Sequence, residues 1–192
     1  MRNQPSDSGS DSGVLLFTYG TLMLTTGIAA VDAATRDAGV TLGRGYIHGH
    51  LYDLGEYPGA VPMTEGWGVA GAVRRPEAEV ELWMEGREAL GMHAAHEDAP
   101  KVWGRLIRLK DPAAYFQAID AYEGFDRANP AESEFIRAET VVFLEHEDKG
   151  YVSQVYYYNF PTHGRVPIHA GDYLAFWHAK GRPAQGRIEG GQ

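Results

Sequence analysis

The first apolar stretch of the chain is Val14-Leu15-Leu16-Phe17-Thr18-Tyr19-Gly20-Thr21-Leu22, which runs into a glycine. An apolar run bounded by a turn residue is typical of a buried β-strand, so we expect a strand over Val14–Tyr19. Gly20 permits a turn with positive φ and leaves the backbone open to a ligand because it has no Cβ. The N–H groups that follow such a turn point into one small space, where they bind carboxylates or oxyanions. The stretch therefore predicts a strand that ends in an anion-binding turn.

The composition is that of a soluble globular protein. The chain has 192 residues, of which 44% are apolar and 22% charged, and this length most simply forms one domain with a sizeable core. A net charge of −9 argues against a nucleic-acid partner, which requires a basic surface. The absence of cysteine excludes disulfides, cysteine nucleophiles and thiolate metal sites.

The two ends of the chain are polar and rich in glycine. Residues 1–13 lack the apolar centre of a signal peptide, and no apolar run approaches the roughly 18 residues of a membrane span. We expect a disordered tail over residues 1–13, one domain over 14–180 and a flexible tail over 181–192. The expected location is cytoplasmic, without a membrane partner, and the oligomeric state stays open.

Hydrophobic periodicity predicts several strands and few helices. Gly45–Leu54 alternates, with Tyr46, His48, His50 and Tyr52 on one face. The other expected strands are Trp67–Arg74, Val102–Leu109, and the hairpin of Ile136–Leu144 and Tyr151–Asn159. The expected helices are Thr25–Ala38 with a cap at Thr25 or Thr26, a helix from Asp111-Pro112 to Tyr122, and Gly171–Ala179.

Two further segments precede the strand expected at Val102–Leu109. Gly55–Pro62 contains two prolines and two glycines, and we expect a shaped loop there. Residues 76–100 are acidic and read as partly helical around Leu82–His96, and with the preceding strand they belong to an insertion over residues 64–101. Strands with few helices between them favour an α+β fold, a mixed sheet or small barrel with flanking helices, over a doubly wound fold.

Glu123 is the candidate catalytic residue. It follows the predicted helix and precedes Gly124, where the negative end of the helix dipole disfavours a carboxylate. Burial beside Tyr122 and Phe125 would raise its pKa further, as a general base near neutral pH requires. The same context also fits a solvated carboxylate in the turn that ends the helix.

The other candidates fit structural readings as well as functional ones. His48 with His50, and His93 with His96, have two-histidine spacings, but no third ligand is marked, so packing is the favoured reading and no metal is expected. Tyr156-Tyr157-Tyr158 places Tyr156 and Tyr158 on one strand face, as strand packing or as a pocket wall. Arg137 is expected either in an edge-strand charge pair or paired with a carboxylate near the site.

Taken in order, these segments resemble the gamma-glutamyl cyclotransferase-like superfamily. The resemblance covers residues 14 to about 178 and is carried by four segments: Tyr19-Gly20-Thr21-Leu22; Leu51-Tyr52-Asp53-Leu54 with Tyr57-Pro58-Gly59-Ala60-Val61-Pro62; Val102–Leu109 with Ile119-Asp120-Ala121-Tyr122-Glu123-Gly124; and Val155–Tyr158 with Gly171-Asp172-Tyr173. One departure is Phe135-Ile136-Arg137, which has Phe where the family usually has the Tyr of Tyr-x-Arg.

The resemblance implies a small mixed barrel with a cavity at one end. It implies that Glu123 is the general acid/base and that substrate is held by residues of three segments: Tyr19, Gly20, Thr21, Leu22, Pro58, Gly59 and Tyr156. The implied substrate is a γ-glutamyl compound whose α-amine attacks its own γ-carbonyl, releasing 5-oxoproline and a free amine. Neither a metal nor an organic cofactor is implied.

The residues leave the substrate and two other classes of function open. The leaving amine is unspecified, and the acidic insertion together with the net charge would suit a cationic one. A non-catalytic module that binds a carboxylate metabolite on the same fold is the first alternative. A histidine-dependent metallohydrolase is the second.

Overall fold

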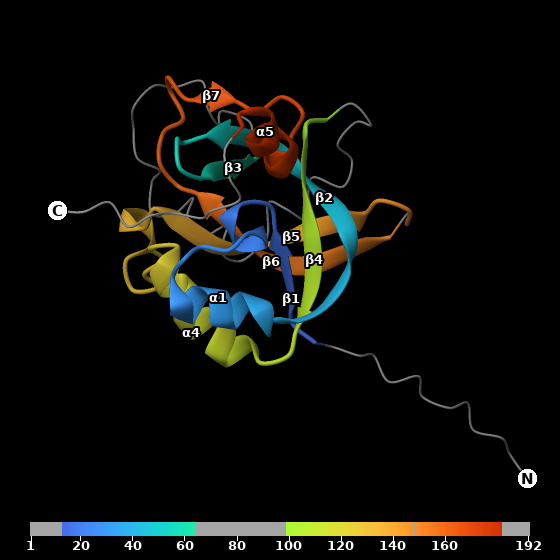
Figure 1. Cartoon of the computed structure of the whole chain (residues 1–192), viewed down its shortest axis with the longest axis vertical. Helices are drawn as coiled ribbons and strands as arrows, with labels where there is room; N and C mark the ends of the chain where they lie inside the picture. The colour runs from blue at the N-terminus through green and yellow to red at the C-terminus, as the bar shows by residue number, and fades with distance from the viewer. Residues whose placement is uncertain (1–12, 64–98, 148, 182–192) are drawn as a thin grey trace, which may run out of the picture.

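Five strands close into a small barrel at the centre of the molecule (Figure 1). This computed structural model describes residues 13–63, 99–147 and 149–181. The barrel strands are β1 (Leu15–Thr18), β2 (Gly39–Asp53), β4 (Lys101–Leu109), β5 (Phe135–Leu144) and β6 (Gly150–Tyr158). Their order is β2-β4-β1-β6-β5, and β5 pairs back onto β2. Because β1 and β6 are parallel and the other pairs antiparallel, the fold is the expected α+β mixed barrel.

Strand β2 is longer than its sequence pattern indicates. The alternation predicted for Gly45–Leu54 is present, with Ile47, Gly49 and Leu51 buried, but the strand begins at Gly39. The extra length allows β2 to pair with β4 over its first part and with β3 and β7 (Val166–Pro167) beyond the barrel.

The prediction of a loop over Gly55–Pro62 is wrong for most of that segment. Only a short turn is present, closed by a 3.0 Å hydrogen bond from Leu54 N to Tyr57 O. Pro58–Pro62 forms strand β3, antiparallel to β2. An edge strand tolerates proline because one row of its N–H groups has no ladder partner. The prolines therefore stand at the two ends of an edge strand and do not prevent it.

Two helices lie side by side on the outside of the barrel, α1 (Ala29–Arg36) and α4 (Pro112–Tyr122) (Figure 1). Helix α4 begins as predicted, since the Asp111 side chain accepts a 3.0 Å hydrogen bond from Ala114 N. Helix α1 begins later than predicted, with Ile28 and neither Thr25 nor Thr26 at the cap position. Thr26 instead donates through its N–H and hydroxyl to Asp32, which holds the preceding turn against the helix.

Two apolar clusters hold these layers together. The first fills the barrel around Phe17, Ile47 and Leu106 and is closed by Tyr173 and Trp177 of α5 (Tyr173–Ala179). The second lies between the barrel and the two outer helices. Its buried members include Leu16, Val31, Tyr115, Ile119, Ile136 and Tyr156. The two faces of β1 thus belong to different cores, with Phe17 inward and Leu16 toward α4.

The remaining elements agree with the sequence pattern or lie outside the described residues. The β5–β6 hairpin and β4 are confirmed, and a short 3-10 helix, η3 (Pro130–Glu132), precedes β5. The strand expected at Trp67–Arg74, the helix around Leu82–His96 and nearly all of both tails lie outside the described residues. In the described part of the chain, each helix is too short or too polar to cross a membrane.

Candidate functional site

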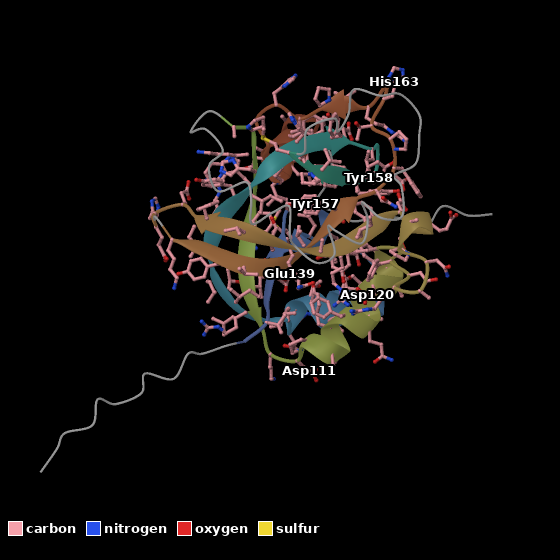
Figure 2. The ribbon with its side chains drawn as sticks, turned by 180° about the vertical axis from the view of Figure 1, so that it is seen from behind. Asp111, Asp120, Glu139, Tyr157, Tyr158 and His163 are labelled. Carbon is pink, nitrogen blue, oxygen red and sulfur yellow. The ribbon has the colours of Figure 1, made fainter. Side chains whose placement is uncertain are left out.

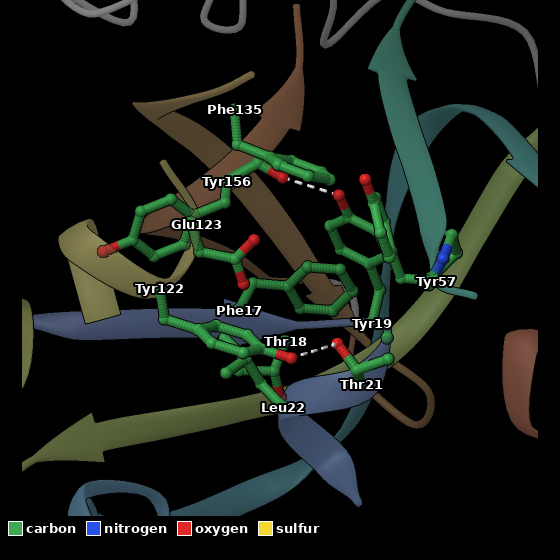
Figure 3. A pocket seen from close by; sticks show the side chains of 12 residues that line it. Phe17, Thr18, Tyr19, Thr21, Leu22, Tyr57, Tyr122, Glu123, Phe135 and Tyr156 are labelled. Carbon is green, nitrogen blue, oxygen red and sulfur yellow. Dashed lines mark hydrogen bonds between the residues drawn. The ribbon is translucent and has the colours of Figure 1, made fainter. Parts of the chain in front are cut away.

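A cavity lies where the end of β1, the end of α4 and the start of β3 meet (Figure 3). The predicted site residues that line it are Tyr19, Gly20, Thr21, Leu22, Pro58, Glu123 and Tyr156. Gly59 does not line it, because this glycine packs against Leu54 and Tyr158, whose atoms would lie 2.8 Å from an added Cβ. Four segments that are far apart in sequence are therefore brought together, as the resemblance implies, with Gly59 as the one exception.

Glu123 is the cap residue at the C-terminal end of α4. Its N–H donates a 2.9 Å hydrogen bond to Ile119 O, and Gly124 reverses the chain with φ of +66°. Only 9% of the residue is exposed, and Figure 3 shows its carboxylate among the aromatic rings of the cavity. Burial raises the pKa of Tyr19 and of Tyr115, and the nearby Glu123 charge raises both further. The solvated-carboxylate reading of Glu123 is therefore wrong.

Tyr19 lines the cavity and connects three strands around it. Its hydroxyl donates to Tyr156 O at 2.6 Å and accepts from Ala60 N at 3.2 Å. Because both partners are backbone groups of other strands, the hydroxyl joins β1 to β6 and β3. Burial raises the pKa of Tyr19 well above its ordinary value, so the hydroxyl keeps its proton. Tyr19 contributes its ring to the cavity wall, while its hydroxyl is committed to the fold.

The turn after β1 has a different geometry from the one its glycine suggests. Gly20 has φ of −135°, so the turn does not use the positive φ that glycine permits. The glycine is required by packing, because an added Cβ would lie 2.6 Å from Pro58 Cγ. The short 3-10 helix η1 (Thr21–Met23) follows, and its first bond runs from Met23 N to Gly20 O at 3.0 Å. The N–H groups of Thr21 and Leu22 precede that bond and have no acceptor within the turn.

A partly buried ionic cluster supports the Glu123 end of the cavity. The Tyr156 hydroxyl donates to Asp120 Oδ1 at 2.6 Å, and Arg137 Nε lies 3.3 Å from the same oxygen. The Arg137 guanidinium also stacks over Phe116 at 3.8 Å. Arg137 therefore pairs with a carboxylate near the site, one of its two predicted roles. The Tyr156 hydroxyl points toward Asp120 on α4 (Figure 2) and away from Glu123 (Figure 3). Burial raises the pKa of Tyr156, and the hydrogen bond to Asp120 raises it further.

Several lining residues were not among the predicted site residues. They are Phe17, Thr18, Tyr57, Tyr122 and Phe135. The Tyr57 hydroxyl donates to Glu134 Oε1, and its ring lies 6.0 Å from that of Phe135. The Tyr122 hydroxyl donates across the cavity to Thr21 Oγ1 at 3.4 Å. Tyr57 and Tyr122 directly precede Pro58 and Glu123, and this adjacency is the signal that could have identified them.

The cavity is small as it stands. Its volume is about 30 Å³. A volume of this size admits a water molecule, whereas small-molecule sites usually occupy several hundred Å³. A ligand larger than a water molecule therefore requires one wall of the cavity to move.

The histidine pairs do not form a metal site in the described part of the chain. His48 and His50 lie on the outer face of β2, as the alternation predicted, and the His48 ring packs between Tyr46 and Phe143. Among the residues described, no three histidine or carboxylate side chains are grouped so as to hold a metal ion. His93 and His96 lie outside those residues.

Comparison with known proteins yields two distant structural neighbours. No family model and no curated protein matches the sequence. YkqA from Bacillus subtilis and the uncharacterized protein PH0828 from Pyrococcus horikoshii each superpose with a TM-score of 0.48 at 14% identity over 88% of this chain. The match covers 98% of PH0828 but only 42% of YkqA. Neither name states an activity.

Proposed function

We propose that the protein is a gamma-glutamyl cyclotransferase-type enzyme that releases 5-oxoproline from a γ-glutamyl compound. The observation that supports this proposal is the burial of the Glu123 carboxylate in the same cavity as the turn at residues 19–22. The turn offers N–H groups to a carboxylate or oxyanion, and Glu123 offers a proton acceptor to an amine. A γ-glutamyl group carries both partners at its α-carbon.

The reaction requires one base and no protein nucleophile. Glu123 accepts a proton from the substrate α-ammonium, whose ordinary pKa is about 8. The freed nitrogen attacks the γ-carbonyl carbon and closes the five-membered ring. The bond from that carbon to the leaving nitrogen then breaks as Glu123 returns the first proton to the departing amine. The ring nitrogen gives its second proton to Glu123, from which solvent or the free amine takes it. One carboxylate thus serves as base and then as acid, for about 10²–10⁴-fold of the rate acceleration.

The surrounding residues orient these groups. The N–H groups of Thr21 and Leu22 suit the substrate carboxylate or the oxyanion of the tetrahedral intermediate. The hydrogen-bonded cluster of Asp120, Tyr156 and Arg137 fixes the last turn of α4, from which Glu123 projects. Holding amine and carbonyl in an attacking arrangement removes much of the entropic barrier to ring closure.

Tyr122 is the wall that moves in this proposal. Its hydroxyl reaches Thr21 through a long hydrogen bond of 3.4 Å, which is weaker than a bond of ordinary length. The side chain is half-buried and lies over the cavity beside Glu123 (Figure 3). Swinging its ring outward enlarges the cavity without a change in the barrel.

A panel of γ-glutamyl compounds tests the proposal. The purified protein is incubated with γ-glutamyl amino acids, γ-glutamyl amines, glutathione and γ-glutamyl-lysine, and the release of 5-oxoproline is measured. We expect turnover of at least one compound. Thermal shift with 5-oxoproline and with glutamate is measured in parallel. Stabilisation by these ligands without turnover of any compound would overturn the proposal in favour of a metabolite-binding module.

A further inference from the structure

A second cavity adjoins the Glu123 cavity on the outer face of the barrel, between α1 and β4. The two cavities share Thr18 and Leu22 as a common wall. The second has a volume of about 500 Å³, which is within the usual range for a small-molecule site. Its other lining residues are Met23, Leu24, Thr25, Asp32, Thr35, Arg36, Thr41, Arg105 and Ile107.

The charged groups that face this cavity are two arginines and one aspartate. Among the described residues, no ion pair within 4.0 Å includes Arg36 or Arg105, although the Arg36 charge contributes to the lowered pKa of Asp32. The Asp32 carboxylate already accepts from Thr26 N at 2.6 Å, Thr26 Oγ1 at 2.7 Å and Gly27 N at 3.0 Å. Its oxygens are therefore occupied by the turn before α1, and the two guanidinium groups leave the cavity with an excess of positive charge. The cavity is therefore opposite in sign to the whole chain, whose net charge is −9.

The wall between the two cavities contains a polar atom without a partner. Thr18 is 3% exposed, and its Oγ1 has no hydrogen-bond partner among the described residues. Thr18 is directly opposite Arg105 in the antiparallel β1–β4 ladder. Opposite residues project on the same face of a sheet with their Cβ atoms about 5 Å apart. The free hydroxyl of Thr18 and the Arg105 side chain thus start from neighbouring positions on the same face of the sheet, at the wall that the two cavities share.

We propose that this second cavity binds an anionic group carried by the amine that leaves. The inference rests on the proposed function. With the glutamyl end beside Glu123, the rest of the substrate passes Thr18 and Leu22 into the second cavity. There Arg105 and Arg36 bind its carboxylate, for which a planar guanidinium is well suited, and the Thr18 hydroxyl donates a further hydrogen bond. The preferred leaving amine therefore carries a carboxylate on the part beyond its nitrogen, and no second cationic group.

Two substrates that differ only in that carboxylate test the assignment. γ-Glutamyl-alanine and γ-glutamyl-ethylamine present the same glutamyl end and the same ethyl group on nitrogen. We expect kcat/KM to favour γ-glutamyl-alanine by about tenfold or more, as loss of a charge-assisted hydrogen bond implies. Arg105→Gln should bring the ratio of the two kcat/KM values close to 1, mainly by raising the KM of γ-glutamyl-alanine. Arg36→Gln should lower the same ratio. Arg127→Gln, an exposed arginine absent from both cavities, is the matched control and should keep the wild-type preference.

Calorimetric binding of both compounds to Glu123→Gln separates this inference from the proposed function. Tighter binding of γ-glutamyl-alanine that disappears in the Glu123→Gln/Arg105→Gln double variant supports the anionic subsite. Equal binding of the two compounds, or a preference that Arg105→Gln leaves intact, overturns the subsite even where 5-oxoproline is released. Absence of 5-oxoproline release from every compound in the wild type would instead contradict the proposed function.

Discussion

Tyr19 directly follows β1, with its ring in the core and its hydroxyl between backbone groups of two other strands. Tyr19→Phe leaves the Tyr156 carbonyl and the Ala60 N–H without their buried partner. We expect a loss of about 1–3 kcal/mol in the free energy of unfolding, measured by urea titration. Tyr151→Phe is the control, because the Tyr151 hydroxyl bonds an exposed Glu147, and its effect should stay within about 0.5 kcal/mol. Equal stability of the two variants would show that Tyr19 does not brace the barrel.

The sequence predicts some candidate site residues better than others, for a physical reason. Glu123 could be chosen as a candidate because the negative end of the helix dipole disfavours a carboxylate at that position, and the residue is buried. The committed hydroxyls of Tyr19 and Tyr156 could not be found, because their partners lie 137 and 36 residues away. The adjoining cavity was also missed, since it forms only when β4 and α1 are placed beside the end of β1.

At the scale of elements, Asp32 ties the turn before α1 to its first helical turn. The Thr26 hydroxyl and N–H and the Gly27 N–H bond the ionised carboxylate and lower its pKa below the ordinary 3.8. A carboxyl with a lowered pKa stabilises the fold above the unfolded-state pKa, and this contribution is lost as pH falls through the folded-state pKa. The Tm of wild type should therefore exceed that of Asp32→Asn near neutral pH.

The Tm difference between wild type and Asp32→Asn should narrow as the pH is lowered from about 4 toward 2. Circular dichroism melts across that pH range measure it. A difference that stays constant down to the lowest pH would contradict the role assigned to the ionised carboxylate.

Sequence signals predicted the elements that are stabilised by residues close to them in the chain. The cap at Asp111 and the β5–β6 hairpin are fixed by neighbouring residues, and both are confirmed. Strand β3 and the early part of β2 were missed because tertiary pairing overrides propensity there. Pro58–Pro62 becomes a strand only because β2 extends beyond the barrel to meet it.

For the whole molecule, closure of the barrel depends on close approach of strand backbones. At Gly104 of β4, an added Cβ would lie 2.1 Å from Thr18 O, so the residue must be glycine for β1 and β4 to pair at this distance. Gly104→Ala should destabilise the fold by about 1–3 kcal/mol or more, seen as a lower Tm. Gly43→Ala in β2 is the control, because its Cβ would meet only the Leu144 side chain, at 3.4 Å. Similar Tm values for both variants would contradict the packing argument.

The overall architecture was predictable because it follows from the number and order of strands and helices, which hydrophobic periodicity shows along the whole chain. Alternating strands, a hairpin and few helices favoured a mixed barrel, and the barrel is observed. The charge of the whole chain does not decide the charge at one site. A net charge of −9 suggested a cationic leaving amine, and the cavity that adjoins the Glu123 cavity is lined by Arg36 and Arg105 together with Asp32. Local charge at a site follows from which strands and helices meet there.

The most direct test of the central claim is the rate of 5-oxoproline release by Glu123→Gln. The substitution keeps the size of the side chain and removes its basicity, and it relieves an unfavourable charge at the end of α4, so the Tm should stay close to that of wild type. We predict that release from the best γ-glutamyl compound falls by about 10²–10⁴-fold. Cyclisation by a folded Glu123→Gln protein at the wild-type rate would contradict the account.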